Sequence, residues 1–242
     1  MTAATFPRDA RGRHQQPGVA LRRMTYDDVD AIEQLERLAF QGIPDDHLWK
    51  RGQVEAHLDR FPEGQWVAEL DGEVVGSCTN LRIPYEVAVA PHTWHQITGG
   101  GYLATHDPEG DALYGTEIMV HPGIRRMGIG RKLFQRRFQY VMEEGLRAFV
   151  TGGRLPGYGE YVREMRPHEY VERVQHEELT DPVLTPDLKW GCTPIGILGN
   201  YITDPDSAHY ACLIEWVNPE WRRYVDAVDT EEAPRRARRV GC

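Results

Sequence analysis

The stretch EIMVHPGIRRMGIGRKL, residues 117–133, decides the fold of this chain. A mostly apolar run ends at Val120, and glycines at positions 128 and 130 stand directly before a helical pattern. Glycines let backbone N–H groups approach an anion closely, and the first turn of a helix adds unpaired N–H donors and a partial positive charge. Four cations lie beside them: Arg125, Arg126, Arg131 and Lys132. The stretch therefore predicts a site for a pyrophosphate or a 3′-phosphate.

The elements on both sides of this stretch predict a βαβ unit. Residues 113–120 and 147–153 are strand-like, and the helix between them has an apolar face at 3.6-residue spacing that ends before Gly145. This order favours phosphate binding over the alternative, a structural glycine turn followed by a solvated basic helix face. The Walker pattern G-x-x-x-x-G-K-[ST] is absent, and the glycine spacing differs from the G-x-G-x-x-G of dinucleotide-binding folds.

The remaining segments predict a mixed α/β protein. A hairpin is expected where Asp71-Gly72 separates two strand-like runs, and Thr25 with Asp28 matches a variant capping box ahead of a helix. Predicted strands are 19–24, 65–70, 73–83, 113–120, 147–153, 193–202 and 209–217, and predicted helices are 29–40, 47–60, 130–144 and 167–179. Residues 181–191 fit no single element.

Composition limits the classes of partner. The net charge of −9 argues against a nucleic-acid partner and suits a cationic acceptor such as an amine. No apolar run approaches the ~18 residues that a membrane helix needs, and none of the four cysteines stands in a C-x-x-C pair. We therefore expect a cytoplasmic protein with no membrane, nucleic-acid or metal partner; a monomer and a homodimer are both open.

The chain is expected to hold one domain between two polar ends. Residues 1–17 are a predicted disordered leader, 18–217 form the domain, and 218–242 are a charged C-terminal tail. Insertions are expected at 84–112 and 154–190.

The motif Val120-His121-Pro122 followed by Arg125-Arg126-Met127-Gly128-Ile129-Gly130 resembles the signature of the GNAT superfamily of N-acyltransferases, [QR]-x-x-G-x-[GA] after a strand ending in Val-x-Pro. The resemblance implies a GNAT-like α/β (α+β) fold, a mixed, splayed sheet of about six or seven strands flanked by helices. It implies acetyl-CoA or another acyl-CoA as co-substrate, with its pyrophosphate on the loop and its pantetheine added to residues 118–120 like a strand. The residues that it assigns to the co-substrate are Ile118, Met119, Val120, Arg125, Arg126, Met127, Gly128, Ile129, Gly130 and Arg131.

A second, looser resemblance is to GNAT modules fused to bacterial nitrilase-type carbon–nitrogen hydrolases. It rests on GGRLPGY (152–158), DPVL (181–184), LGNYITD (198–204) and the pair Glu215-Trp216. No hydrolase domain fits in this chain, so the resemblance implies a stand-alone relative. It does not identify the acceptor, which stays open among small amines, amino acids, antibiotics and protein lysines or N-termini.

Acyl transfer from a thioester to an amine needs a base for the ammonium and a donor for the developing oxyanion. Glu117 is the candidate base, because it lies on the strand before the loop and points opposite to Ile118. A carboxylate that only pairs with an arginine is the alternative. By resemblance, the oxyanion donor is the backbone N–H of Met119 or Val120.

The reaction also needs an acid for the departing thiolate. The position of the family's usual tyrosine matches Asp187, so the tyrosine is missing there. Tyr201 is the candidate acid, narrowly ahead of Tyr158 and Tyr161. Other side chains with a weaker claim, each weighed against a packing or loop role, are His92 with His95 (metal), His121 (CoA), Trp94 and Tyr102 (acceptor) and Cys192 (nucleophile).

The predicted function is that of an N-acyltransferase, which moves an acetyl or other acyl group from acyl-CoA to an amine by direct attack on the thioester. Because the usual tyrosine is missing, a non-catalytic acyl-CoA-binding or sensing module is the alternative. A phosphate-binding interaction domain unrelated to CoA is a third.

Overall fold

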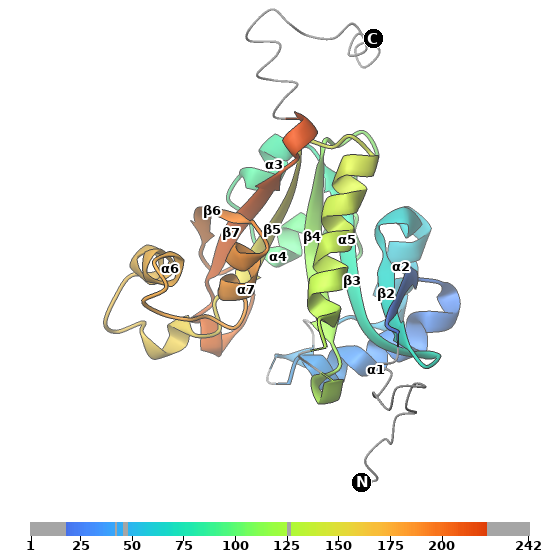
Figure 1. The fold of residues 1–242 in the computed structure, drawn as a ribbon, viewed down its shortest axis with the longest axis horizontal. Coiled ribbons are helices and arrows are strands. Elements are labelled where there is room, and N and C mark those ends of the chain that lie inside the picture. Colours follow the sequence, from blue (N-terminus) through green and yellow to red (C-terminus); the bar gives the residue numbers. More distant parts are fainter. Residues whose placement is uncertain (1–17, 42, 46–47, 125–126, 222–242) are drawn as a thin grey trace, which may run out of the picture.

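The computed structural model describes residues 18–41, 43–45, 48–124 and 127–221. In this part of the chain, seven strands form one sheet with helices on both faces (Figure 1). The strands are β1 Ala20–Arg23, β2 Trp66–Leu70, β3 Glu73–Ile83, β4 Ala112–Val120, β5 Ala148–Arg154, β6 Thr193–Leu198 and β7 Ala211–Val217. The helices are α1 Val29–Ala39, α2 Arg51–Arg60, α3 Tyr85–Val89, α4 Trp94–Ile97, α5 Ile129–Glu143, α6 Pro167–Gln175 and α7 Leu184–Lys189. The predicted leader, Arg125, Arg126 and the tail from residue 222 lie outside the described residues.

The sheet order is β1-β2-β3-β4-β5-β7-β6, and β4 and β5 are its parallel neighbours. Their pairing joins Ala112–Gly115 to Ala148–Thr151 and then stops, although both strands continue. Beyond that point β4 stays paired with β3, while β5 stays paired with β7. We call this divergence of β4 residues 116–120 from β5 residues 152–154 the fork. The predicted sheet that splays between these two strands is confirmed.

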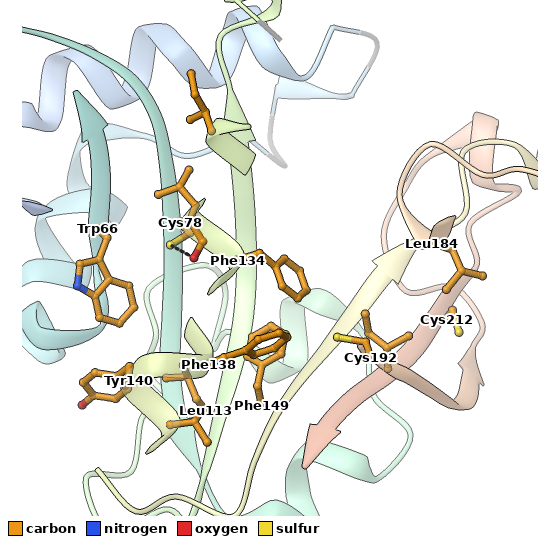
Figure 2. Close-up of a cluster of buried hydrophobic side chains, with 14 of the residues drawn as sticks. Trp66, Cys78, Leu113, Phe134, Phe138, Tyr140, Phe149, Leu184, Cys192 and Cys212 are labelled. Atoms are coloured by element: carbon orange, nitrogen blue, oxygen red, sulfur yellow. Dashed lines mark hydrogen bonds between the residues drawn. The ribbon is translucent and has the colours of Figure 1, made fainter. Parts of the chain in front are cut away.

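Two hydrophobic clusters cover opposite faces of the sheet. Helix α5 lies along β4 in the front of Figure 1, and its aromatic side chains meet Phe149 of β5 (Figure 2). The rings of Phe134 and Phe138 lie 5.3 and 5.8 Å from that of Phe149. Helices α1 and α2 pack on the other face, where Tyr114 is buried. The adjacent β4 residues Leu113 and Tyr114 thus belong to different clusters, because successive side chains of a strand point to opposite faces.

A β-bulge in β4 decides which way Glu117 points. The pairing with β3 joins Thr79 to Glu117 and Asn80 to Gly115, so Thr116 is an additional residue. The bulge reverses the alternation of side chains, and Glu117 therefore points to the same face as Tyr114 although three positions separate them. Ile118 packs in the hydrophobic cluster between α5 and the sheet, which we call the α5 cluster, on the face opposite to Glu117.

Several predicted boundaries are confirmed by their local chemistry. Asp71 and Gly72 both have positive φ, 52° and 85°, as a type I′ hairpin turn requires. The capping box at Thr25 is present and opens a short 3₁₀ turn ahead of α1. Residue Gly145, with φ of 63°, follows the end of α5.

Other predicted boundaries are wrong, and left-handed residues explain most of them. Helix α6 ends at Gln175 rather than 179, because Glu177 has φ of 60°. Asn200 and His209, with φ of 51° and 65°, shorten β6 and β7 relative to the predicted 193–202 and 209–217. Helix α2 begins at Arg51 rather than 47.

The ambiguous segment 181–191 contains a short helix. Asp181 Oδ1 accepts the N–H groups of Val183 and Leu184, both at 2.8 Å, and so satisfies donors at the beginning of α7. This places Asp187, on α7, against β5.

Candidate active site

A cavity of about 140 Å³ opens at the fork. Strand β4 supplies Thr116, Glu117 and Ile118, and strand β5 supplies residues 151–154. The rest of the lining comes from both faces of the sheet: Glu36, Phe40, Ile43, Leu48, Trp94, Phe134, Arg137, Val183, Asp187, Tyr201 and Ile202. The fork is therefore an opening between the sheet face that α1 covers and the face that α5 covers, and the cavity lies in this opening.

Two glutamates form a carboxyl pair in this cavity. Glu36 of α1 is 2% exposed and lies within hydrogen-bonding reach of Glu117. Burial raises the pKa of Glu36 to about 7, and burial together with the charge of Glu36 raises the pKa of Glu117 well above its usual value. Glu36 Oε2 and Glu117 Oε1 have no N–H or O–H donor among the described residues. Near neutral pH the pair therefore shares one proton and keeps one negative charge.

We expect the buried pair to make stability depend on pH. Because the pKa of Glu36 is higher in the folded than in the unfolded protein, its contribution is complete below about pH 4.5 and is lost as the pH rises through about 7. Glu36→Gln stays neutral and keeps an acceptor for the Trp49 N–H, now 3.2 Å from Glu36 Oε1. The variant should match the wild type near pH 4.5 and exceed its free energy of unfolding at pH 8, because only the wild type then has to keep Glu36 charged or protonated against solvent. Denaturant unfolding at both pH values tests this; an equal difference at the two would contradict it.

Arginine side chains approach the cavity from two sides. Arg137 of α5 is 1% exposed, and its Nη2 donates to the carbonyls of Thr79 and Glu117 at the bulge. Arg137 thereby holds the Glu117 backbone from the side of the sheet that α5 covers, while the Glu117 carboxyl group lies on the opposite side. Arg154 is paired with Asp204 at 2.7 Å. Its charge is therefore partly compensated.

Asp187 is a third carboxyl group at the fork. Its Oδ2 faces Gly153 of β5, where a Cβ on the glycine would lie only 3.3 Å away. Burial raises the pKa of Asp187 to about 8, so at neutral pH it is mostly protonated and can donate a proton. The sequence comparison with the family's tyrosine position located Asp187 but gave it no role.

Tyr201 lies at the cavity, as a candidate acid must. It is 3% exposed, and its ring packs so closely on Gly152 that a Cβ there would lie 2.8 Å from the hydroxyl oxygen. The other two tyrosines do not line the cavity: the Tyr158 hydroxyl donates to Met165 O at 3.0 Å, and Tyr161 packs in the α5 cluster. Burial raises the pKa of Tyr201 to about 12, so its hydroxyl stays protonated at neutral pH.

The remaining candidate residues from the sequence also differ in whether they lie at the cavity. Trp94 lines the cavity, whereas Tyr102 is 48% exposed and does not. His121 Nδ1 accepts the Gly123 N–H at 3.1 Å in the turn before the phosphate loop. Cys192 is buried, and burial raises the pKa of its thiol, which makes it a poor nucleophile. His92 contacts a buried tyrosine rather than a second metal ligand.

The described part of the predicted phosphate loop has the expected backbone form. Gly128 is the N-cap of the 15-residue helix α5 and has φ of 75°, a conformation that favours glycine. Among the described residues, apart from the glycine's chain neighbours and the backbone of α5 itself, no atom lies within 4 Å of a Cβ built at Gly128, so this part of the chain leaves the space over the helix N-terminus open. Ile129, Gly130 and Arg131, in the first turn, supply N–H groups without partners inside the helix. These features suit an anion at this end of α5.

The free edge of β4 lies between this helix end and the cavity. The His121 N–H donates to Val75 O at 2.8 Å, and the register pairs Met119 with Ser77. Because alternate residues of a strand direct their N–H groups to the same side, the Met119 N–H points to β3. The N–H groups of Ile118 and Val120 point into the fork, where β5 has left. Of the two candidate oxyanion donors, this favours Val120.

No helix among the described residues is long and apolar enough to cross a membrane. No group of three or more His, Cys, Asp or Glu side chains in the same ranges is placed to hold a metal ion.

Comparison with known proteins agrees with this geometry. Residues 29–156, more than half of the chain, match the model of the acetyltransferase (GNAT) family. The uncharacterized N-acetyltransferase YkwB of Bacillus subtilis (strain 168) is 34% identical over 85% of this chain and 91% of its own length. The chain belongs to the acetyltransferase (GNAT) family.

Two other similar proteins extend the comparison. The probable hydrolase YhcX of the same strain is 40% identical over 84% of this chain, and the match spans only 39% of that protein. The structure of the GNAT-like decarboxylase GphF in complex with isobutyryl-CoA has a TM-score of 0.70 at 23% identity, over 82% of this chain and 99% of that one. The structural likeness shows a common fold. The looser resemblance to GNAT modules that are fused to nitrilase-type hydrolases stays an expectation from the sequence.

Proposed function

We propose that this protein is an acyl-CoA-dependent N-acyltransferase that moves an acetyl or other acyl group to an amine. The observation that carries the proposal is the fork, because one opening joins a free strand edge, a helix N-terminus and the carboxyl pair Glu36–Glu117. Family membership supports acyl transfer as the class of reaction. The acceptor stays open between a small-molecule amine and a protein amine.

The residues present suit an acyl-CoA. Its pyrophosphate fits the open space over Gly128 and the first turn of α5, together with Arg131 and, by resemblance, the sequence neighbours Arg125 and Arg126. Pantetheine fits the edge of β4 at Ile118–Val120, whose outward N–H and C=O groups lack a strand partner on the β5 side. The thioester carbonyl would then accept from the Val120 N–H.

Each chemical step has a residue of this chain at the cavity. The carboxyl pair retains one negative charge, which attracts the acceptor ammonium. When the shared proton lies on Glu36, Glu117 carries the charge and accepts a proton from the ammonium, directly or through water. The neutral amine then attacks the thioester carbon, and no covalent enzyme intermediate is needed. Tyr201 protonates the departing thiolate, and the neutral carboxyl group of Asp187 adds a second donor on the β5 side.

A binding experiment separates this function from its two alternatives. Acetyl-CoA should raise the melting temperature in proportion to the logarithm of its concentration, because a ligand of the folded state alone stabilises it. An absence of stabilisation by CoA and acetyl-CoA would support an interaction domain unrelated to CoA. Stabilisation without thiol release in the presence of amines would support a non-catalytic acyl-CoA-binding module.

A further inference from the structure

Three side chains form a continuous hydrogen-bonded series from the cavity to the protein surface. The hydroxyl oxygens of Tyr201 and Tyr114 are 3.1 Å apart, and the Tyr114 hydroxyl is 2.7 Å from His92 Nε2. His92 Nδ1 lies 2.7 Å from Ala90 O, in an exposed contact. Tyr201 is at the fork, Tyr114 is fully buried, and His92 is half-buried between α3 and α4. The three residues come from separate segments of the chain.

The backbone fixes the direction of this series. A carbonyl oxygen only accepts, so His92 Nδ1 carries the hydrogen that is donated to Ala90 O. In the neutral imidazole Nε2 is then an acceptor, and the Tyr114 hydroxyl donates to it. The Tyr114 oxygen in turn accepts from the Tyr201 hydroxyl. Every hydrogen therefore points from the cavity toward the surface, and Tyr201 presents a free lone pair to the cavity.

The position of the series is itself held by the backbone. The Trp94 N–H donates to Tyr201 O at 2.8 Å and joins the His92 segment to the Tyr201 loop. The close packing of Tyr201 on Gly152 fixes the end at the fork. This arrangement keeps three polar groups aligned through an otherwise hydrophobic cluster.

The proposed reaction releases a proton that needs an outlet. An ammonium and a thioester become an amide, a thiol and one free proton. Near neutral pH the carboxyl pair carries one shared proton and one negative charge, so it must pass an accepted proton on before the next turnover. We propose that Tyr201, Tyr114 and His92 form a proton relay that carries this proton from the cavity to solvent. The inference rests on the proposed function and adds two residues to it.

Proton transfer along the relay starts at the cavity. The Tyr201 oxygen takes a proton from the acceptor ammonium, directly or through the carboxyl pair, as its own proton passes to Tyr114 and the Tyr114 proton passes to His92 Nε2. The imidazolium loses its Nδ1 proton to water. Tyr201 now holds its hydrogen on the cavity side and gives it to the thiolate as the carbon–sulfur bond breaks. The second amine proton restores Tyr201. Tautomer exchange of His92 through water, together with rotation of the Tyr114 and Tyr201 hydroxyls, restores the initial direction.

The acidities of the three groups suit this role. Burial raises the pKa values of Tyr114 and Tyr201, so both hydroxyls pass protons on without resting as anions. Burial lowers the pKa of His92, more than its hydrogen bond to Ala90 raises it, so the imidazolium releases a proton readily at neutral pH.

The first test needs no substrate. Nitrogen-15 NMR of the imidazole ring in the free wild-type protein should show His92 as the neutral Nδ1–H tautomer at pH 7.5, assigned by its loss in His92→Ala. The Nε2–H tautomer would reverse the direction of the series and overturn the proposal, whether or not the protein proves to be an acyltransferase.

The second test measures turnover. Tyr114→Phe and His92→Ala should each lower thiol release roughly 10-fold to 10²-fold, within the range for assisted proton transfer, with acetyl-CoA affinity unchanged. Added imidazole should restore His92→Ala, because it replaces the terminal acceptor. It should not restore Tyr114→Phe, because the gap then lies inside the protein.

A matched control distinguishes a relay from the loss of a buried hydroxyl. Tyr158 is also buried, and its hydroxyl donates to Met165 O at a distance of 3.0 Å. It does not line the cavity, so Tyr158→Phe should keep wild-type turnover. Normal turnover in His92→Ala, or equal rescue of both relay variants by imidazole, would overturn the relay while leaving the acyltransferase intact.

Discussion

Replacing Glu117 by Gln should lower the rate of acyl transfer by roughly 10²–10⁴-fold while acetyl-CoA still binds with wild-type affinity. The substitution keeps the shape of the side chain and mimics its protonated form, which burial already favours, so the fold should persist. The phosphate loop and the β4 edge are untouched. Turnover measured by thiol release, with the dissociation constant from calorimetry, checks both parts. Raising the pH should partly restore the variant, because solution then supplies more neutral amine.

The partner carboxyl group gives this prediction a control. Glu36→Gln removes the negative charge that raises the pKa of Glu117, so the base should ionise at lower pH. The acid limb of the pH–rate profile should move to lower pH while maximal turnover remains. A structural carboxylate at position 117 would give a different pattern, in which Glu117→Gln loses stability and acetyl-CoA affinity together. Near-normal turnover in a folded Glu117→Gln would assign the base role to water and the backbone.

Replacing Gly128 by Asp should abolish acetyl-CoA binding. The substitution places a negative charge over the N-terminus of α5, where the pyrophosphate is expected, and adds a side chain at φ of 75°. Gly128→Asn has nearly the same shape without the charge and tolerates left-handed φ, so it should weaken binding much less. Calorimetric titration of the two variants separates charge from strain.

The other end of the same helix supplies a matched control. Gly145 also has positive φ, 63°, and open space around its Cβ position. Gly145→Asp therefore introduces comparable strain and the same charge beyond the C-terminus of α5, and it should lower stability while leaving the dissociation constant unchanged. An unchanged dissociation constant in Gly128→Asp would show that the phosphate lies elsewhere.

The parts of the structure that local chemistry dictates could be predicted from the sequence. Asp71-Gly72 predicted a hairpin turn. An apolar run, then Gly128, then an amphipathic pattern predicted a strand, a turn and a helix in that order. The parallel pair of β4 and β5 then followed from the βαβ order. The family signature added the splay between them. The sequence therefore located the fork between these two strands.

The candidate site was predicted only where a motif marked it. Glu36 lies 81 positions before Glu117 on an ordinary amphipathic helix, and no spacing rule brings the two together. Tyr114 reads as an apolar strand residue, and only the three-dimensional contact with Tyr201 and His92 gives its hydroxyl a role. The bulge at Thr116, which sets the direction of Glu117 relative to Tyr114, has no signal in the sequence. Long-range contacts of this kind depend on packing rather than on local pattern.

The central proposal is that an amine is acylated at the fork, with Glu117 as its base. The most direct measurement is product formation by mass spectrometry when the protein, acetyl-CoA or longer acyl-CoAs and a panel of amines are incubated together. We expect an acylated amine and free CoA in equal amounts with the wild type, and a loss of both with Glu117→Gln under conditions where each protein is saturated with acyl-CoA. Saturation of the wild type with acyl-CoA without an acylated product from any amine would contradict the proposal.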